Sequence, residues 1–306
     1  MGNRMVMKLL AEGHEVVVWN RTQEKVENLK LKIENSKNTK NLEIAESIED
    51  LTKKLDPQRI IWSMLPAGEA TEEILMGPGG LAEFVEEGDI VVDGGNAYFE
   101  DTQRRFDYFT SKGVKFLGIG VSGGLIAAKE GYPLMVGGSE DGYEEIKPIL
   151  DSLAKPRGGH EYFGEGGAGH FVKMVHNGIE YGYMQAIGEG FGVLEKAPYD
   201  YNLAKVAKLY TKGTLLSGFM MDRTVEALEK DPKLSEIEGY VEASGEGEWT
   251  VNQAKEENVP VEIIEESLEF RTKSREDPNI AASFAARMVA ALRNAFGGHE
   301  VKKKSD

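Results

Sequence analysis

The feature that most constrains this fold is the alternation of strand and helix patterns through the first half of the chain. Strand-like runs rich in β-branched residues occupy 15–19, 59–65, 89–95, 114–120 and 133–138. Helical patterns, such as those at 99–112 and 139–154, lie between these runs. Strands that alternate with helices form a mainly parallel sheet with helices on both faces. Nearly every run ends in Gly, Asn, Ser or Pro, and ligands bind beyond the carboxyl ends of such strands.

From about residue 166 the pattern changes to long helical stretches with few β-branched runs. These stretches lie at 166–197, 202–212, 214–230, 250–258, 260–273 and 279–296. The change falls near the glycine cluster "FGEGGAGHF" at 163–171. We therefore predict an α/β Rossmann-type doubly wound parallel sheet over 1–165, followed by an all-α helical domain over 166–306. Many dehydrogenases have this arrangement, although the fold alone does not name the chemistry.

Composition excludes several classes of function. The chain has 36 basic and 52 acidic residues, a formal charge of −16, which argues against a nucleic-acid binder. It has no cysteine, which excludes disulfides, Cys-ligated zinc and thiol catalysis, and favours the reducing cytoplasm. No apolar run is long enough to cross a bilayer, and residues 1–12 lack the apolar core of a signal peptide.

The stretch 167–191 carries most of the chemistry. On a helix of about 100° per residue, Lys173, His176, Asn177, Glu180 and Tyr181 share an arc of about 140°. A Lys and a Glu two turns apart can serve as base and acid at opposite ends of one small substrate. The His and Asn can orient its hydroxyl groups, and the Tyr can reach a terminal anion.

The plain structural alternative is a solvated helix face with one charge pair. Three observations weigh against it. The polar set mixes five chemistries instead of repeating Glu and Lys. Gly178 and Gly182 each cost the helix roughly 1 kcal/mol relative to Ala, which suggests close packing. Another backbone or a ligand can also come close to the glycines at 164, 166, 167 and 169.

This stretch resembles a known family. "GAGHFVKMVHNGIEYG" at 167–182 is similar to the signature helix of decarboxylating 6-phosphogluconate dehydrogenases. Four further segments match in the family's order: "DGGN" (93–96), "GVSGG" (120–124), "GEGEWT" (245–250) and "RNAFGGH" (293–299). The similarity covers essentially the whole chain, and the length is that of the family's short form.

The resemblance implies an activity and roles for the helix. The family oxidises the 3-hydroxyl of 6-phosphogluconate with NADP and releases CO2 to give ribulose 5-phosphate, in the pentose phosphate pathway and gluconate utilization, without a metal. Lys173 would be the general base, which near neutral pH requires a lowered pKa. Glu180 would donate a proton to C1, and Asn177 and His176 would bind the sugar chain.

The resemblance also implies where the substrate's two ends are held. Ser122, Gly123 and Gly124 would hold the carboxylate end, and Asn96 would touch substrate and nicotinamide. Tyr181 and Arg271 would bind the 6-phosphate, Arg271 through its bidentate fork. From the residues alone, 122–124 and Asn96 are equally well explained as turns, and Arg271, like Arg275, as a surface arginine.

The turn "WNRT" after the first strand-like run bears on the cofactor. NAD-specific folds place Asp or Glu here, whereas an Arg accommodates a 2′-phosphate. The neutral Asn20, the cationic Arg21 and the hydrogen-bonding Thr22 therefore favour NADP, with NAD possible. Thr22 also suits the N-cap of the next helix, and the two roles are compatible. Leu65, Pro66 and Ala67, after the next run, would line the adenosine side.

The chain opens on the second half of a nucleotide-binding unit. A helical pattern from Asn3 ends at Gly13, and the strand-like run 15–19 follows. Met1 and Gly2 match the pair that ends the family's glycine turn, so Gly2 is a cofactor-binding candidate. The preceding strand and two glycines are not in the sequence, and we expect a natural start about ten residues earlier.

Two segments depart from the family's pattern. The loop matched by 244–248 reads "SGEGE", without the lysine that members often carry. Longer members have a tail whose Arg and His enter the neighbouring subunit's site. Here Lys302 to Lys304 or His299 are the candidates to replace them. The family is dimeric or larger, so a homodimer or homotetramer through the helical domain is expected, and 281–298 has a small-residue face suited to close helix packing.

Two other functions stay open from the sequence. The first is another β-hydroxyacid dehydrogenase, acting on a small acid such as 3-hydroxyisobutyrate. That group shares the "SGG" loop and the spacing of Lys173 and Asn177, but it needs no phosphate-binding Arg. The second is a catalytically inactive Rossmann protein that senses a cofactor or acts as a scaffold.

Overall fold

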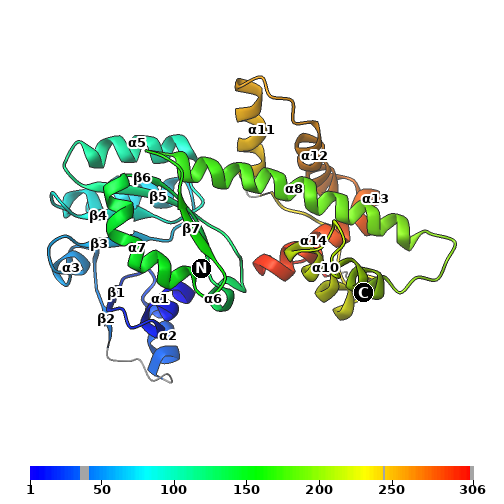
Figure 1. Cartoon of the computed structure of the whole chain (residues 1–306), viewed down its shortest axis with the longest axis horizontal. Coiled ribbons are helices and arrows are strands. Elements are labelled where there is room, and N and C mark those ends of the chain that lie inside the picture. The colour runs from blue at the N-terminus through cyan, green and yellow to red at the C-terminus, as the bar shows by residue number, and fades with distance from the viewer. Residues whose placement is uncertain (35–40, 244, 304–306) are drawn as a thin grey trace. The chain divides into compact units, whose positions relative to one another are not determined.

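The fold consists of two compact units. A computed structural model describes residues 1–34, 41–243 and 245–303 (Figure 1). Unit 1 comprises Met1–Lys173, and unit 2 comprises Met174–Asp306. The division falls inside one long helix, α8 (Ala168–Glu195), which begins three residues after the boundary expected at 165. No helix among the described residues is both long and apolar enough to span a membrane.

Unit 1 contains the mainly parallel sheet expected from the alternating pattern. Strands β3 (Ile60–Ser63), β4 (Ile90–Asp93), β5 (Lys115–Val121), β6 (Pro133–Gly138) and β7 (Gly159–Tyr162) form one sheet in that order. Strands β1 (Val16–Val18) and β2 (Leu42–Ile44) form a separate parallel pair. Every pairing is parallel except that of β5 with β6.

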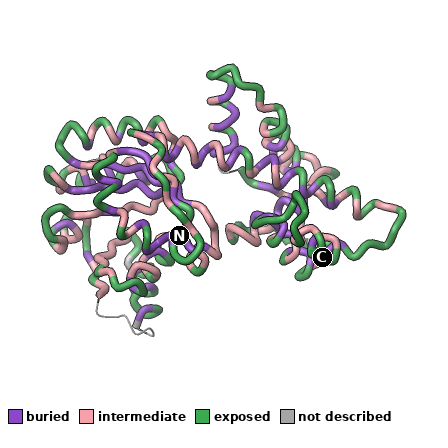
Figure 2. Tube along the Cα trace, in the orientation of Figure 1, coloured by how far each residue is buried: buried purple, intermediate pink, exposed green. Residues whose placement is uncertain are grey.

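Helices cover both faces of the larger sheet, which confirms the doubly wound fold. Ile90 and Val92 of β4 pack in a cluster with α1 (Gly2–Ala11) and α7 (Glu140–Ala154). The intervening Val91 packs in a different cluster with α4 (Glu69–Met76) and α5 (Phe99–Thr110). Successive residues of a strand point to opposite faces, so both faces are buried (Figure 2). The remaining helices of unit 1 are α2 (Gln23–Glu34), α3 (Ile48–Lys53) and α6 (Ala127–Glu130).

The start of α8 lies directly on this sheet because glycines leave room for it. A Cβ placed on Gly169 would come within 2.5 Å of the carbonyl oxygens of Gly118 and Met135, and would also meet the backbone of Gly137. Real Cβ atoms do not approach other atoms this closely. The contact therefore requires glycine at 169, and the glycine cluster noted in the sequence marks a backbone-to-backbone contact.

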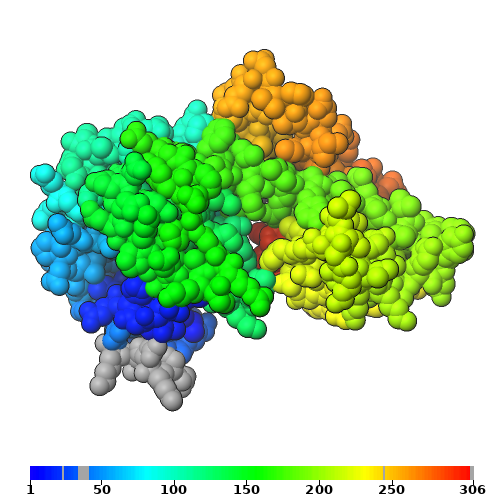
Figure 3. Space-filling model, in the orientation of Figure 1, coloured from blue at the N-terminus to red at the C-terminus, as the bar shows by residue number. Residues whose placement is uncertain are grey.

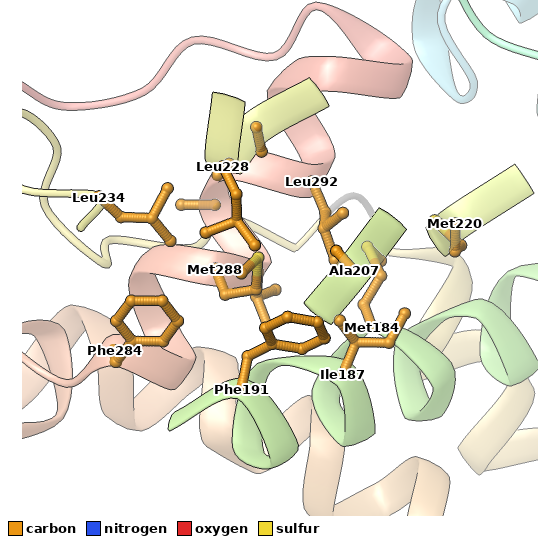
Figure 4. Packing of buried hydrophobic residues seen from close by; sticks show 14 of the residues in the cluster. Met184, Ile187, Phe191, Ala207, Met220, Leu228, Leu234, Phe284, Met288 and Leu292 are labelled. Carbon is orange, nitrogen blue, oxygen red and sulfur yellow. The ribbon is translucent and has the colours of Figure 1, made fainter. Parts of the chain in front are cut away.

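Unit 2 is helical, as predicted. Its helices after α8 are α9 (Leu203–Tyr210), α10 (Phe219–Lys230), α11 (Glu246–Glu256), α12 (Glu262–Glu276), α13 (Pro278–Ala281) and α14 (Phe284–Gly297). The core gathers Met184, Ile187 and Phe191 of α8 against Met288 and Leu292 of α14 (Figure 4). Helices α11 and α12 lie side by side at the surface (orange in Figure 3) and are joined by an ion pair between Lys255 and Glu265 at 2.6 Å.

The small-residue face of 281–298 packs inside unit 2. Ala286, Ala290 and Ala291 are buried, and the last two lie in the core cluster with Met288 and Leu292. Helix α8 also packs closely against α14. A Cβ on Gly188 of α8 would lie 2.8 Å from the carbonyl oxygen of Ala285. This face therefore serves packing within the chain.

Some local expectations differ from the structure. Helix α10 begins at Phe219 instead of 214, because Gly218, at φ 140°, sets the turn before it. Helix α11 begins at Glu246 instead of 250, after Gly245 at φ 95°. Strands β2 and β7 were not expected from the sequence. They are short and carry few β-branched residues, so their pairing partners define them.

The contact of α8 with the sheet gives a first prediction. Gly169→Ala should lower the free energy of unfolding by about 3 kcal/mol or more, because its methyl group has no space. Gly190→Ala is the matched control on the same helix, where a Cβ would meet nothing within 4 Å. It should raise stability by about 0.5–1 kcal/mol through helix propensity. Urea unfolding followed by circular dichroism measures both, and equal effects would contradict the close contact.

Candidate active site

Three expected loops of unit 1 meet at one edge of the sheet. Strands β3, β4 and β5 are parallel neighbours, with Ser63 paired to Asp93 and Asp93 paired to Gly118. Parallel strands in register end at the same edge, so the loops that follow them gather there. These loops carry Leu65, Pro66 and Ala67 after β3, Asn96 after β4, and Ser122, Gly123 and Gly124 after β5.

The loop that carries Asn96 is held by a buried ion pair. Asp93 is fully buried, and its carboxylate accepts hydrogen bonds from the Gly95 N–H at 3.1 Å and from Arg105 at 3.1 Å. Arg105, 1% exposed, also donates to Glu72 on α4 at 3.0 Å. A charged pair with all of these partners fixes the loop geometry. Asn96 itself is exposed.

The loop at 122–124 is a tight turn that only glycine can make. Gly123 and Gly124 have φ of 94° and 56°. A Cβ on Gly123 would lie 2.7 Å from the Cβ of Ala127. The Ser122 N–H donates to the carbonyl oxygen of Pro133 at 3.0 Å. The segment is therefore a turn, and the Ser122 side chain is half-buried at the sheet edge. Its role toward the substrate stays a prediction.

Lys173 lies beside that loop. It is 5% exposed, and a Cβ on Gly120 would lie 2.8 Å from its Cγ, so its side chain packs over the end of β5. One turn earlier on α8, His170 is buried and shares a 2.7 Å hydrogen bond with Thr102. Burial lowers the pKa of His170, so this histidine is neutral. The structure thus packs Lys173 over Gly120, two residues before the 122–124 loop, within unit 1.

In unit 2, the polar residues of α8 lie on its packed side. Asn177 and Tyr181 are buried, whereas Ile179 is 62% exposed. A Cβ on Gly178 would lie 2.6 Å from Thr250 of α11, and one on Gly182 would lie 3.3 Å from Ile263 of α12. The glycines therefore mark close packing, as predicted. The solvated-face alternative is wrong for Asn177 and Tyr181.

His176 connects two of these polar groups. Its Nδ1 lies 3.1 Å from Oδ1 of Asn177 and 3.8 Å from a carboxylate oxygen of Glu180. The side chains of His176 and Glu180 are 39% and 18% exposed. Three of the four proposed catalytic residues thus form one connected group that reaches both the packed side of α8 and solvent.

Arg271 is buried. It is 2% exposed, and its guanidinium lies over the ring of Tyr181 at 3.2 Å from the centroid. Helix α11 also meets the ring of Tyr181, because a Cβ on its Gly247 would lie 2.7 Å from Cδ2 of Tyr181. Burial lowers the pKa of Arg271 to about 10, and its Nη2 has no hydrogen-bond partner among the described residues. The surface alternative is wrong, and Arg275 instead donates to the carbonyl oxygen of Val241 at 3.0 Å.

Arg293 and His299 lie in the electrostatic neighbourhood of Arg271. Arg293 of α14 is 6% exposed, and burial is the main cause that lowers its pKa. The pKa of His299 is lowered by burial and then by Arg293 and Arg271. Arg293 received no role in the sequence analysis, although it begins the matched segment "RNAFGGH". Glu246, buried on α11, lies in the same charged neighbourhood.

The lysine candidates at the end of the chain have other positions. Lys302 lies over the ring of Tyr240, with its Nζ 3.5 Å from the ring centroid. Ser244 and Lys304 lie outside the described residues. Of the candidates proposed to replace the longer tail, His299 is therefore the one that the structure places beside Arg271.

A cavity of about 310 Å³ lies beyond the end of β1. Among the expected cofactor residues Arg21 lines it, whereas Leu65, Pro66 and Ala67 do not. Trp19 and Arg21 line it from the turn after β1, and Glu46 and Glu73 line it from the segment after β2 and from α4. The Asn20 carboxamide accepts from the Thr22 N–H at 2.9 Å, which holds the turn. The cavity lies beyond a strand end and carries a cation, so these residues fit the adenosine half of a dinucleotide.

Other cofactor candidates lie near strand β3. Gly2 begins α1, and a Cβ there would touch Met64 at 3.4 Å. The Leu65 carbonyl lies 2.6 Å from the position that a Cβ on Gly95 would take, and the Pro66 carbonyl accepts from Thr71 at 2.7 Å. Among the described residues, no group of three or more His, Cys, Asp or Glu side chains is placed to hold a metal ion.

Comparisons with known proteins decide the family. Residues 1–167 match the NAD-binding domain of 6-phosphogluconate dehydrogenase, and residues 169–285 match its C-terminal domain. The chain belongs to the 6-phosphogluconate dehydrogenase family. An NAD⁺-dependent, decarboxylating 6-phosphogluconate dehydrogenase of Haloferax volcanii is 38% identical over all of this chain and 97% of its own length. A putative 6-phosphogluconate dehydrogenase of Bacillus subtilis is 36% identical over 99% of this chain and 97% of its own.

Solved structures support the same assignment. The 6-phosphogluconate dehydrogenase of Plasmodium falciparum, solved with NADP⁺ and with 6-phosphogluconate, has a TM-score of 0.81 and 30% identity. The match covers 90% of the present chain and 60% of the Plasmodium falciparum chain. A 3-hydroxyisobutyrate dehydrogenase of Salmonella typhimurium, at 18% identity and TM-score 0.72, covers 94% of this chain and 95% of its own, and shares the fold alone.

The buried cations of unit 2 give a second prediction. Inorganic phosphate should raise the melting temperature of the full chain by about 2–4 °C, because an anion that meets Arg271 binds only the folded state. Arg271→Met should abolish this shift. Arg275→Met is the control on the same helix and should keep it. An equal phosphate shift in wild type and Arg271→Met would contradict an anion site at Arg271.

Proposed function

We propose that this chain converts 6-phosphogluconate to ribulose 5-phosphate and CO2, with reduction of NADP, as in the pentose phosphate pathway. The observation that carries the proposal is the buried Arg271 stacked on Tyr181, with Arg293 and His299 beside it. A buried cationic cluster is costly without an anionic partner. A small acid without a phosphate would bring no second anionic group to pair with these buried cations.

Lys173 is the proposed general base. Lys173 is 5% exposed over β5, and burial is one of the causes by which a lysine can become a base near neutral pH. Lys173 takes the proton of the 3-hydroxyl, and the bound dinucleotide supplies the acceptor for the hydride from C3. The protonated Lys173 then polarises the new 3-keto group. The C1–C2 bond breaks, CO2 leaves, and the electron pair forms an enediol.

Glu180 is the proposed acid that completes the reaction. It lies two turns beyond Lys173 on α8, about 10 Å along the helix, which matches a base and an acid that act on different atoms of one substrate. Glu180 delivers a proton to the carbon that was C2 of 6-phosphogluconate and becomes C1 of ribulose 5-phosphate. His176 and Asn177 bind the hydroxyls of the sugar chain, and the 3.8 Å approach of His176 to Glu180 orients that carboxyl group.

The two ends of the substrate have separate sites in this proposal. Ser122, Gly123 and Gly124 hold the carboxylate, through the Ser122 hydroxyl and the backbone N–H groups of the turn. Arg271, Tyr181, Arg293 and His299 hold the 6-phosphate, because two guanidinium groups can donate in pairs to phosphate oxygens.

The proposed cofactor is NADP, with NAD as the alternative. Gly2, the 20–22 turn, the 65–67 loop and Asn96 are the groups that would hold it. Arg21 supports NADP because a cation at this position accommodates a 2′-phosphate. The NAD⁺-dependent Haloferax volcanii relative supports the alternative. No metal has a role in the proposed mechanism.

We also propose a homodimer or homotetramer through unit 2, in the cytoplasm. Unit 2 exposes several large apolar side chains, which a neighbouring subunit would cover. They include Val193, Leu209, Leu215, Leu216 and Phe219. Light scattering tests the oligomeric state, and a monomer at micromolar concentration would contradict it.

A substrate comparison tests the activity. Reduced nicotinamide absorbance should increase with 6-phosphogluconate and should be at least about 10²-fold weaker with gluconate, which lacks the phosphate. Turnover of 3-hydroxyisobutyrate but not of 6-phosphogluconate would favour the other β-hydroxyacid dehydrogenases. A folded protein that is silent with every acid would favour the inactive alternative.

A third prediction concerns Lys173. Lys173→Met should lower kcat by about 10³-fold, because the 3-hydroxyl proton then has no acceptor. The melting temperature should change little, since Met keeps the length of the apolar part. Lys205→Met, on the exposed side of α9, is the control and should keep kcat within about twofold. A Lys173→Met enzyme with near-normal kcat would exclude the base role.

A fourth prediction concerns Glu180. Glu180→Gln should lower kcat by about 10²-fold, because the amide keeps the shape but cannot donate the proton to C1. Glu189→Gln, on an exposed part of the same helix, should leave kcat within about twofold. Ribulose 5-phosphate formation measures both variants. Equal rates for the two would contradict the role of Glu180.

A further inference from the structure

Arg21, the arginine that would bind a 2′-phosphate, already forms an ion pair with a carboxylate. In the cavity beyond β1, Arg21 Nη1 lies 3.4 Å from a carboxylate oxygen of Glu73. Both side chains line the cavity, together with the carboxylate of Glu46. The charges of these three groups sum to −1. The two carboxylates therefore make the cavity less favourable for a dianionic 2′-phosphate than the presence of Arg21 alone would predict.

The helix that carries Glu73 is anchored through its neighbour in the sequence, Glu72. Glu72 accepts hydrogen bonds from Arg104 at 2.9 and 2.8 Å and from Arg105 at 3.1 and 3.0 Å. Arg105 is itself bound to the buried Asp93. These bonds fix α4 against α5 and so place the backbone of Glu73 at the cavity edge. The Arg21 and Glu73 side chains are 73% and 63% exposed, so their ion pair lies at the solvent side of the cavity.

The two dinucleotides meet this arrangement differently. A ribose 2′-hydroxyl is neutral and can donate a hydrogen bond to a carboxylate, which is the usual contact for NAD. A 2′-phosphate carries two negative charges. It would compete with Glu73 for Arg21 and would be repelled by both carboxylates of the cavity.

We propose that Glu73 determines the dinucleotide preference of this chain: by engaging Arg21 and adding negative charge beside the 2′ position, it weakens NADP binding and makes NAD a competent cofactor. This inference rests on the proposed function, which places the adenosine ribose near Arg21. It refines that function. Arg21 alone would favour binding of NADP, whereas Arg21 paired with Glu73 allows both NADP and NAD to bind.

Isothermal titration calorimetry of the full chain with NADP and with NAD tests the proposal without turnover. Glu73→Gln should tighten NADP binding by about 5- to 20-fold at low salt, because one repelling charge near the phosphate is removed. NAD binding should change by less than about twofold or weaken. Glu69→Gln makes the same charge change on the same helix outside the cavity lining, and should alter neither affinity by more than about twofold.

A second background tests whether Glu73 acts through Arg21. In an Arg21→Met protein, Glu73→Gln should improve NADP binding by several-fold less than it does with Arg21 present, because only the direct repulsion of the phosphate is then relieved. The same gain with and without Arg21, or equal gains for NADP and NAD, would overturn the proposal. Failure of the proposed function has a different signature. In that case 6-phosphogluconate gives no reduced nicotinamide, while the dinucleotide affinities still report on Glu73.

Discussion

The contact on which the site depends is the backbone approach between the first turn of α8 and the ends of β5 and β6. No side chain larger than hydrogen fits at Gly169, because the carbonyl oxygens of Gly118 and Met135 are so near. This contact sets Lys173 over Gly120, beside the turn that follows β5. The same helix then continues to Glu195 and carries Asn177, Glu180 and Tyr181 at fixed helical positions. Of the residues proposed for proton transfer, Lys173 is thus positioned within unit 1 and Glu180 within unit 2.

The second constraint is the burial of cations in unit 2. Arg271 and Arg293 are 2% and 6% exposed, and burial lowers the pKa of both. The ring of Tyr181 and the carboxylates of Glu180 and Glu246 compensate part of this cost. Buried charge with incomplete hydrogen bonding stabilises a fold poorly and binds an oppositely charged ligand well. A phosphate-bearing substrate is the simplest reason for this arrangement.

Local patterns predicted the parts of the fold that local chemistry determines. The β-branched run of β4 and the Gly178 and Gly182 pair predicted a buried strand and a close helix contact, and both are correct. Strands β2 and β7 were missed because few residues mark them and their pairing partners are distant. Ile179, apolar in sequence, is 62% exposed, while Arg293, in an alanine-rich helix, is buried. Burial of a charged residue depends on what packs around it, which spacing along the chain does not reveal.

The most direct test follows the fate of one carbon. 6-Phosphogluconate labelled with carbon-13 at C1, incubated with the full chain and NADP or NAD, should release the label as bicarbonate in a one-to-one ratio to reduced nicotinamide. Oxidation coupled to loss of C1 distinguishes this reaction from simple oxidation of a hydroxy acid. Reduced nicotinamide with the label retained in the sugar acid would contradict oxidative decarboxylation, and so would release of neither product by the folded protein.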